Sequence, residues 1–339
     1  MSKYRFAGAE AEEAWLTGTA GEISLRNRQS LSKLRMRGPK AGLRWSLALA
    51  MVLASFPCRS AGSDFDGSRA FALLEKQCSF GPRYPGSPGH RACLDFLTSE
   101  LRRYTSAVTH QSFDHRFGLD SMQVAKATNL VARLWPERRR RVLLCAHWDT
   151  RPWADEDPDP RNRRKPILGA NDGASGVAVL LELARVLQES PPKVGIDIVL
   201  FDAEDQGRPG DEDTYAVGSR HFARSLSREE RPEAAILLDM VGDRDLNLYV
   251  EGYSHRFARS LVEMVWSTAH RLGFAEFIPR VEYYVTDDHV PLLSVGIPAI
   301  DVIDFDYPYW HTLEDTPDKC SPASLEKVGR VLLQVIRQW

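Results

Sequence analysis

Side chains that can bind a metal or move a proton follow several apolar segments of this 339-residue chain. They are His147 and Asp149 after Val142–Ala146, Asp202, Glu204 and Asp205 after Ile196–Phe201, Asp239 after Ala235–Leu238, and His311 downstream of Ala299–Ile303. Carboxylate oxygens and imidazole nitrogens are ligands of Zn²⁺, and a catalytic zinc keeps one position open for the reacting group. These residue types therefore predict a metal-assisted reaction if the fold brings the side chains together.

A further candidate ligand, Asp172, lies in the glycine-rich segment Gly169–Gly176. This segment lacks the Lys-Ser/Thr pair of a P-loop and the G-x-G-x-x-G spacing of a dinucleotide-binding turn, and its aspartate would repel a phosphate. Any one of these acids alone is more often a turn or cap residue. Because such residues recur after several strands, a shared site is the better interpretation.

In two pairs of nearby residues, the two members can have different roles at the site. In Glu204-Asp205, one carboxylate can bind the metal while the other moves protons. His147 and Asp149 stand two residues apart, so Asp149 can orient the imidazole ring of His147. The acidic run 155–159 can bind Ca²⁺ in principle, but a charged surface loop is the more common outcome.

The elements that must position these residues alternate between strands and helices. Strand-like runs cover residues 129–135, 142–146, 196–201, 235–240, 246–250 and 299–303, and helical spacing marks residues 91–104, 176–189, 219–226, 255–272 and 325–337. Apolar strands separated by helices predict a mostly parallel twisted sheet with helices on both faces. In such a sheet the ligand site lies at the carboxyl ends of the strands. We expect one α/β domain over residues 63–339.

Residues 1–62 have the character of a leader. Basic residues precede the apolar run 45–56, and small residues follow it at 60–62. The run is too short to span a bilayer, but it suits the core of a signal peptide. We expect the signal peptide to start near Met36 after an over-extended reading frame. The protein is then exported, periplasmic or secreted, with the leader cleaved or kept as an anchor.

Charge and cysteine usage bear on the class of protein. The formal net charge is −2, and since residues 1–62 are basic, the remainder is acidic and unsuited to follow a nucleic-acid backbone. The five cysteines lack zinc-finger spacing. An exported protein permits one disulfide among Cys78, Cys93 and Cys320, whereas Cys145 lies in an apolar strand as a buried thiol. We expect a monomer with no nucleic-acid partner and no stable membrane span beyond the leader.

Three longer motifs resemble the bacterial members of the animal-type glutaminyl-peptide cyclotransferases, which share a superfamily with the zinc aminopeptidases. The motifs are His147-Trp-Asp-Thr-Arg-Pro-Trp-Ala-Asp155, Lys165-Pro-Ile-Leu-Gly-Ala-Asn-Asp-Gly-Ala-Ser-Gly176 and Phe201-Asp-Ala-Glu-Asp205. The match runs from about Phe65 to the C-terminus and includes Phe80-Gly-Pro-Arg83 and Asp287-Asp-His289. The resemblance implies a single zinc aminopeptidase-like α/β domain with a central mixed sheet.

The resemblance also implies an activity, the cyclisation of N-terminal glutamine of peptides or proteins to pyroglutamate with release of ammonia. The implied roles are Asp172, Asp205 and His311 as ligands of one zinc, Glu204 as general base and acid, Asp239 and Asp287 as a carboxylate cluster beside it, and Trp310 in the apolar wall of the substrate pocket. We also count Asp301 and Trp148 as candidate pocket residues, although Trp148 can equally pack the loop. A cis peptide at Asp172–Gly173 is a further implied feature.

Two positions depart from the family pattern. Many relatives carry Glu where this chain has Asp205, although the bacterial cyclases resemble this chain there. The animal enzymes carry His where this chain has Asp301. The second departure changes the hydrogen-bond network around the site and leaves the metal ligands intact.

Two other functions stay open on the sequence alone. In a di-zinc aminopeptidase, His147 and Asp239 would join Asp172 to hold a second metal, and all the possible ligands are present. A non-catalytic binding ectodomain would have lost ligands or the base, and here none is missing. The long motifs favour cyclisation.

Overall fold

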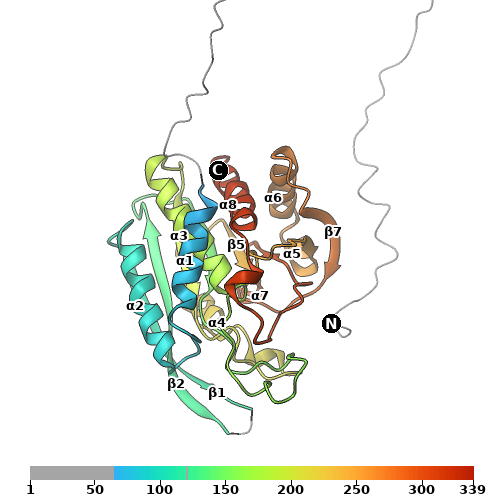
Figure 1. The fold of residues 1–339 in the computed structure, drawn as a ribbon. Coiled ribbons are helices and arrows are strands. Elements are labelled where there is room, and N and C mark those ends of the chain that lie inside the picture. The colour runs from blue at the N-terminus through green and yellow to red at the C-terminus, as the bar shows by residue number, and fades with distance from the viewer. Residues whose placement is uncertain (1–64, 120) are drawn as a thin grey trace, which may run out of the picture. The chain divides into compact units, whose positions relative to one another are not determined.

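The computed structural model describes residues 65–119 and 121–339. Within this part of the chain, eight α-helices and eight strands follow one another, with three short 3-10 helices between them (Figure 1). The predicted leader and the start near Met36 lie outside the described residues. No helix in the described part combines the length and the apolar character needed to cross a membrane.

A six-stranded sheet with the order β1-β2-β4-β3-β5-β8 lies at the centre. Its strands are β1 (Val108–Phe117), β2 (Gln123–Leu134), β4 (Gly195–Phe201), β3 (Arg141–His147), β5 (Ala234–Asp239) and β8 (Ala299–Ile303). Strands β4, β3, β5 and β8 are parallel neighbours, whereas β2 pairs antiparallel with both β1 and β4. The predicted mixed, mostly parallel sheet is therefore confirmed.

Helices cover both faces of this sheet (Figure 1). On one face α1 (Gly67–Cys78), α3 (Ala174–Glu189) and α8 (Pro322–Ile336) pack on one another, α2 (Pro88–Arg102) contacts α3, and α6 (Arg259–Arg271) contacts α8. On the other face, α4 (Val217–Ser225) and α7 (His289–Ser294) pack together and against the strands. The predicted α/β class is confirmed.

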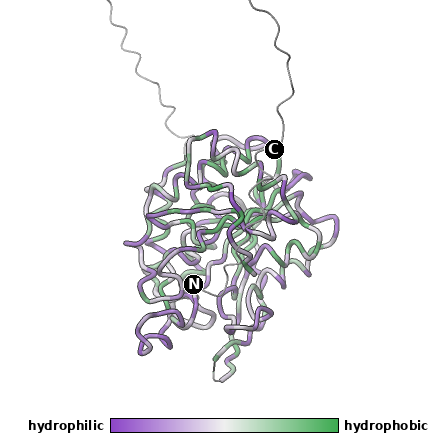
Figure 2. Tube along the Cα trace, turned by 90° about the vertical axis from the view of Figure 1, so that its right-hand side faces the viewer, coloured by the Kyte–Doolittle hydropathy of each residue, from purple (hydrophilic) through white to green (hydrophobic). Residues whose placement is uncertain are grey.

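The alternation of side chains along β3 explains why every residue in its centre is apolar. Leu144 and Ala146 join the large core with α1, α3 and α8, whereas Leu143 and Cys145 join a smaller core with residues of α4 and α7. Neighbouring residues of a strand point to opposite faces, so a strand covered on both sides is apolar throughout. Figure 2 shows the hydrophobic residues gathered along the central strands and the hydrophilic residues outside.

Several element boundaries differ from the prediction. The helix predicted over residues 255–272 is two helices, α5 (Gly252–Phe257) and α6, because Ala258 between them leaves the helical conformation. The strand predicted over residues 246–250 is β6 (Leu248–Glu251), which pairs with β7 (Phe277–Tyr283) in a separate two-stranded sheet. Most residues of β1 and β7 are exposed or half-buried, so neither strand shows an apolar run in the sequence.

The disulfide that the sequence permits is not formed. Cys78, Cys93, Cys145 and Cys320 are all buried free thiols. Burial raises the pKa of Cys78 to about 11 and that of Cys93 to about 12, so both stay protonated at neutral pH. These cysteines therefore act as small apolar side chains in the core.

Candidate active site

The carboxyl ends of the parallel strands and the loops that follow them enclose one cavity of about 310 Å³. Seven residues with predicted roles line it. They are the metal ligands Asp172, Asp205 and His311, the base Glu204, the carboxylate cluster Asp239 and Asp287, and the wall residue Trp310. These residues come from loops up to 139 positions apart in the sequence, between Asp172 and His311. The cavity thus lies at the edge of the sheet where the sequence predicts the reactive side chains.

Asp172, Asp205 and His311 can hold one metal ion, and we call them the first metal group. One ligand atom of each lies within 4.8 Å of the others, and His311 Nε2 is 3.0 Å from Asp205 Oδ1 and 3.7 Å from Asp172 Oδ2. Both Oδ2 atoms are buried and have no hydrogen-bond partner among the described residues. Uncompensated buried oxygens fit a cation, and two carboxylates with one imidazole are a donor set of zinc.

The backbone before α3 fixes Asp172. Asp315 accepts hydrogen bonds from the backbone N–H groups of Asn171 (2.8 Å) and Asp172 (3.2 Å). The peptide bond Asp172–Gly173 is cis, which confirms the expectation. A Cβ at Gly173 would lie 2.4 Å from the backbone oxygen of His147, so a side chain there would push Asp172 away from the site. The sequence did not identify Asp315, which carries no spacing signal.

Arg151 and Asp155 hold the other two members of the first metal group. Arg151 is fully buried, and its Nη1 donates to Asp205 O (3.0 Å) and Oδ1 (3.2 Å). Its Nε and Nη2 donate to the two oxygens of Asp155 at 2.6 and 2.7 Å. Asp155 Oδ1 in turn lies 3.4 Å from His311 Nδ1. A closed ring of contacts therefore joins Arg151, Asp155, His311 and Asp205.

Residues 155–159 form the expected charged surface loop only in part, since Glu156 is exposed whereas two of the aspartates point inward. Asp155 turns toward the site, and Asp157 is buried and accepts a hydrogen bond from the backbone of Leu313 (3.1 Å). The spacing of Arg151 and Asp155 within one motif was the available signal. An i, i+4 charge pair is too common on solvent-exposed faces to identify such a contact from the sequence.

Glu204 follows β4 and faces the cavity from a buried position. Burial and the charge of Asp287 raise the pKa of Glu204 well above its usual value. A raised pKa makes a carboxylate a better proton acceptor, which suits a group that takes up a proton and later returns it. Ala203, just before it, adopts a left-handed φ of 59°, a conformation that non-glycine residues rarely adopt and that is often found at functional sites.

The hydrogen bonds of Asp149 go to the segment that begins at Glu204 and not to His147. Its carboxylate accepts hydrogen bonds from the backbone N–H of Glu204 (3.2 Å) and Asp205 (3.1 Å) and from Gln206 Nε2 (2.7 Å). His147 Nδ1 lies 3.7 Å from Asp149 Oδ1, an ion-pair contact beyond hydrogen-bond distance. The expected role of Asp149 as the hydrogen-bonding partner of His147 is therefore corrected.

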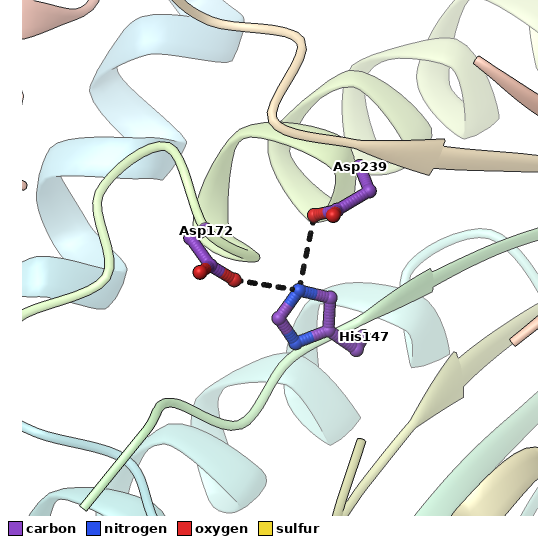
Figure 3. A group of neighbouring side chains, drawn as sticks. All are labelled: His147, Asp172 and Asp239. Carbon is purple, nitrogen blue, oxygen red and sulfur yellow. Dashed lines mark hydrogen bonds and ion pairs between the residues drawn. The ribbon is translucent and has the colours of Figure 1, made fainter. Parts of the chain in front are cut away.

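His147, Asp172 and Asp239 form a second group of possible ligands, the second metal group (Figure 3). His147 Nε2 lies 3.0 Å from Asp172 Oδ1 and 3.1 Å from Asp239 Oδ1. His147 is fully buried and does not line the cavity. Burial opposes the charged form, but the neighbouring carboxylates raise the pKa of His147 well above its usual value. In the metal-free protein a charged imidazolium thus links these two carboxylates.

The carboxyl groups of Asp239 and Asp287, across the cavity from the first metal group, carry less negative charge than two free carboxylates would. Burial raises the pKa of Asp239 to about 7 and also raises that of Asp287. Behind Asp287 lie Asp301 and His289, each with a possible ligand atom within 4.8 Å of the others. Asp301 is fully buried and does not line the cavity, so its expected place in the pocket wall is wrong. Asp301 instead interacts electrostatically with Asp287 and Asp239, which both line the cavity.

The two tryptophans differ in position. Trp310 lines the cavity, and its ring stacks on His311 with a centroid distance of 3.8 Å. Trp148 is fully buried in the large core, where it stacks on His90. The expectation that Trp148 lines the pocket is wrong, because it directly follows His147 and a strand turns successive side chains to opposite faces.

Aromatic and acidic residues that the sequence did not single out complete the cavity. Tyr253 and Tyr284 both line it and pack edge to face at 5.2 Å, and Glu212 and Tyr215 line it as well. They lie in loops and short helices outside the central sheet. Such segments have no apolar periodicity, so the sequence offers no signal that places them at the cavity.

The comparisons with known proteins agree with this site. The profile of Peptidase family M28 matches residues 129–336. A glutaminyl-peptide cyclotransferase of Boiga dendrophila is 25% identical over 289 residues, which cover 74% of this chain and 75% of the relative. The solved structure of Tannerella forsythia glutaminyl cyclase shows 40% identity and a TM-score of 0.78 over 81% of this chain and 99% of that one. A leucine aminopeptidase precursor from Bacteroides thetaiotaomicron shows 38% identity and a TM-score of 0.78, over 81% and 98% of the two chains.

Proposed function

The chain belongs to Peptidase family M28, and on that premise we propose that it cyclises the N-terminal glutaminyl residue of peptides and proteins to pyroglutamate and releases ammonia. The similar glutaminyl-peptide cyclotransferases and glutaminyl cyclases support this reaction. The observation that carries the proposal is the position of Glu204, whose buried carboxyl group faces the cavity beside the first metal group.

We propose that the first metal group holds one zinc ion. Asp172, Asp205 and His311 supply the oxygen and nitrogen donors that zinc prefers, and their buried oxygens lack other partners. When bound there, zinc supplies a Lewis acid that polarises the side-chain amide of the substrate glutamine. Trp310, stacked on His311, gives this part of the cavity an apolar wall for the methylene groups of that side chain.

The reaction requires a proton to move from one nitrogen of the substrate to another. Glu204 takes a proton from the α-amine, whose nitrogen then forms a bond to the side-chain amide carbon. Glu204 returns the proton to the amide nitrogen as its bond to that carbon breaks, and ammonia leaves. The raised pKa of Glu204 suits a group that accepts a proton from one nitrogen and holds it until it passes to the other.

Asp239 and Asp287 anchor the substrate amine in this proposal. Both line the cavity next to Glu204, and burial raises the pKa of both. Close buried carboxylates cannot all stay ionised, so they share protons, and their oxygens can accept hydrogen bonds from the neutral α-amine. An amine placed between them is oriented for attack on the amide carbon.

The test is an assay of the purified protein with a glutaminyl peptide. We expect one ammonia released per pyroglutamate formed, with activity lost on chelation and restored by zinc. Glu204→Gln is expected to lower turnover by about 10²- to 10⁴-fold while the protein retains zinc. Near-normal turnover of Glu204→Gln would show that the assigned role is wrong.

A di-zinc aminopeptidase is the second candidate. The second metal group brings His147 and Asp239 to Asp172 with ligand atoms within 4.8 Å, and one similar structure carries the name leucine aminopeptidase precursor. In that enzyme a metal-activated water would cleave the first peptide bond. Release of a free N-terminal amino acid from leucyl and glutaminyl peptides would favour this candidate over cyclisation.

We also propose that the protein acts outside the cytoplasm as a monomer. The proposed export rests on residues 1–62, where basic residues precede an apolar run typical of a signal peptide. A substrate bearing N-terminal glutamine is itself the product of prior proteolysis, which suits an exported enzyme. Mass analysis of the mature N-terminus and light scattering test the two statements.

A further inference from the structure

We infer that Glu212, at the cavity mouth, selects peptides that carry a basic residue immediately after the N-terminal glutamine. The inference rests on the proposed cyclisation and specifies which substrates of that reaction the site prefers. Four observations support it: the reach of the cavity, the unpaired charge of Glu212, the absence of basic residues from its lining, and an exposed aromatic side chain.

The cavity reaches beyond the groups that the reaction needs. Its inner part contains the first metal group and Glu204, whereas Glu212 and Tyr284 line the same cavity and are exposed. Its volume of about 310 Å³ falls in the range of pockets that enclose more than one small side chain. When the first residue of a peptide occupies the inner part, its second residue points toward this mouth.

The Glu212 carboxylate lines the exposed part of the cavity and has no ion-pair partner in the part of the chain that the structure describes. Its neighbours differ, because Asp211 pairs with Arg208 at 2.8 Å and Asp213 pairs with Arg220 at 3.8 Å. The backbone of Glu212 is held in place, since its carbonyl oxygen accepts hydrogen bonds from Arg220 Nη2 (3.2 Å) and from the backbone N–H of Tyr215 (3.3 Å). Its negative charge is therefore available to a substrate.

The remainder of the lining favours a cation as well. Six carboxylates line the cavity, and among the described residues no lysine or arginine does: Asp172, Glu204, Asp205, Glu212, Asp239 and Asp287. A site of one sign attracts the opposite charge and repels its own. Tyr284, with 47% of its surface exposed, also offers a ring face on which a guanidinium or ammonium group can rest.

The experiment compares three peptides that differ only in the second residue, which is Arg, Ala or Glu. For each we measure kcat/KM of the full protein with zinc bound, in the wild type, in Glu212→Gln and in Asp213→Asn. The wild type is expected to prefer Arg over Glu, and Glu212→Gln is expected to reduce that ratio about three- to fivefold, the effect of one exposed charge pair. The ratio should also contract at high salt.

Asp213→Asn is the matched control. Asp213 directly follows Glu212, but its side chain is 94% exposed and does not line the cavity, so its substitution should leave the ratio as in the wild type. An unchanged ratio in Glu212→Gln, or an equal loss on all three peptides, would overturn the inference while cyclisation still stands. No pyroglutamate from any peptide with the wild type would instead overturn the proposed function.

Discussion

The two metal groups share Asp172 and differ in what surrounds their histidines. In the first metal group, His311 lines the cavity and contacts Asp155, which Arg151 holds in turn. In the second metal group, His147 is fully buried, and its Nε2 already lies between two carboxylate oxygens at 3.0 and 3.1 Å. Both Nε2 atoms lie 3.0 Å from a carboxylate oxygen of their own group, so the histidines differ in that His311 lines the cavity whereas His147 is enclosed.

This difference shows why the ligand types alone do not determine how many metals bind. Both groups contain two aspartates and one histidine with comparable spacing. Only the first group leaves carboxylate oxygens of both its aspartates buried and unpartnered. A buried carboxylate oxygen without a partner is costly, and a bound cation would remove that cost at both aspartates of the first metal group. The account therefore predicts one zinc, and each of the following experiments can contradict or refine that statement.

The largest effect on zinc binding is expected when the two histidines are substituted one at a time. His311→Ala removes a direct ligand, so zinc affinity should fall by more than about a hundredfold, and turnover should fall with it. His147→Gln removes only a partner of Asp172 and Asp239, so the protein should still bind one zinc per chain. Metal content after dialysis measures both. Loss of zinc from His147→Gln together with retention in His311→Ala would reverse the assignment.

A smaller effect is expected from Arg151, which touches Asp205 directly and His311 through Asp155. Arg151→Met should weaken zinc binding about 10- to 100-fold, the usual cost of losing a group that orients metal ligands. Arg151→Lys keeps the charge but lacks the forked geometry, so its affinity should be intermediate. Competition with a chromophoric chelator measures the affinities independently of turnover.

Arg161→Met is the control for this position. Arg161 also pairs with an aspartate, Asp159, but its side chain is 89% exposed and lies outside the cavity. It should leave zinc affinity unchanged. Equal affinities in Arg151→Met and Arg161→Met would show that the ring of contacts around the first metal group does not support the metal.

The smallest effect for a single step of the experiment is a pH dependence of zinc binding, at most about tenfold for each pH unit. Burial alone would lower the pKa of His311, but the charge of Asp205 and the contact with Asp155 raise it to about 9 in the metal-free protein. Below that pH, zinc must displace a proton from His311, so the affinity should rise with pH by up to about tenfold per unit and level off near pH 9. Calorimetry in buffers of different ionisation enthalpy measures the released protons. An affinity that is constant from pH 6 to 9 contradicts the raised pKa.

The sequence predicted the parts of the fold and site that follow from strand and helix patterns. Asp205 and Asp239 follow apolar strands, so their meeting at one edge of the sheet was foreseeable. Glu204 and His311 were also candidates because they follow apolar strands, and the resemblance added Asp287; all three line the cavity.

The features that the sequence missed depend on tertiary contacts between loops. Arg151 and Asp315 support the metal ligands through hydrogen bonds across 54 and 143 residues, and no local pattern encodes such pairs. Trp148 was misplaced because its residue type fits both a pocket and a core. Its position directly after His147 on β3 decides the matter, and that required the strand boundary.

Anomalous diffraction at the zinc edge from crystals of the zinc-loaded protein tests the central claim most directly. The account predicts one anomalous peak per chain, within bonding distance of Asp172, Asp205 and His311. A second peak of similar height between His147 and Asp239, or an empty first metal group, would contradict it.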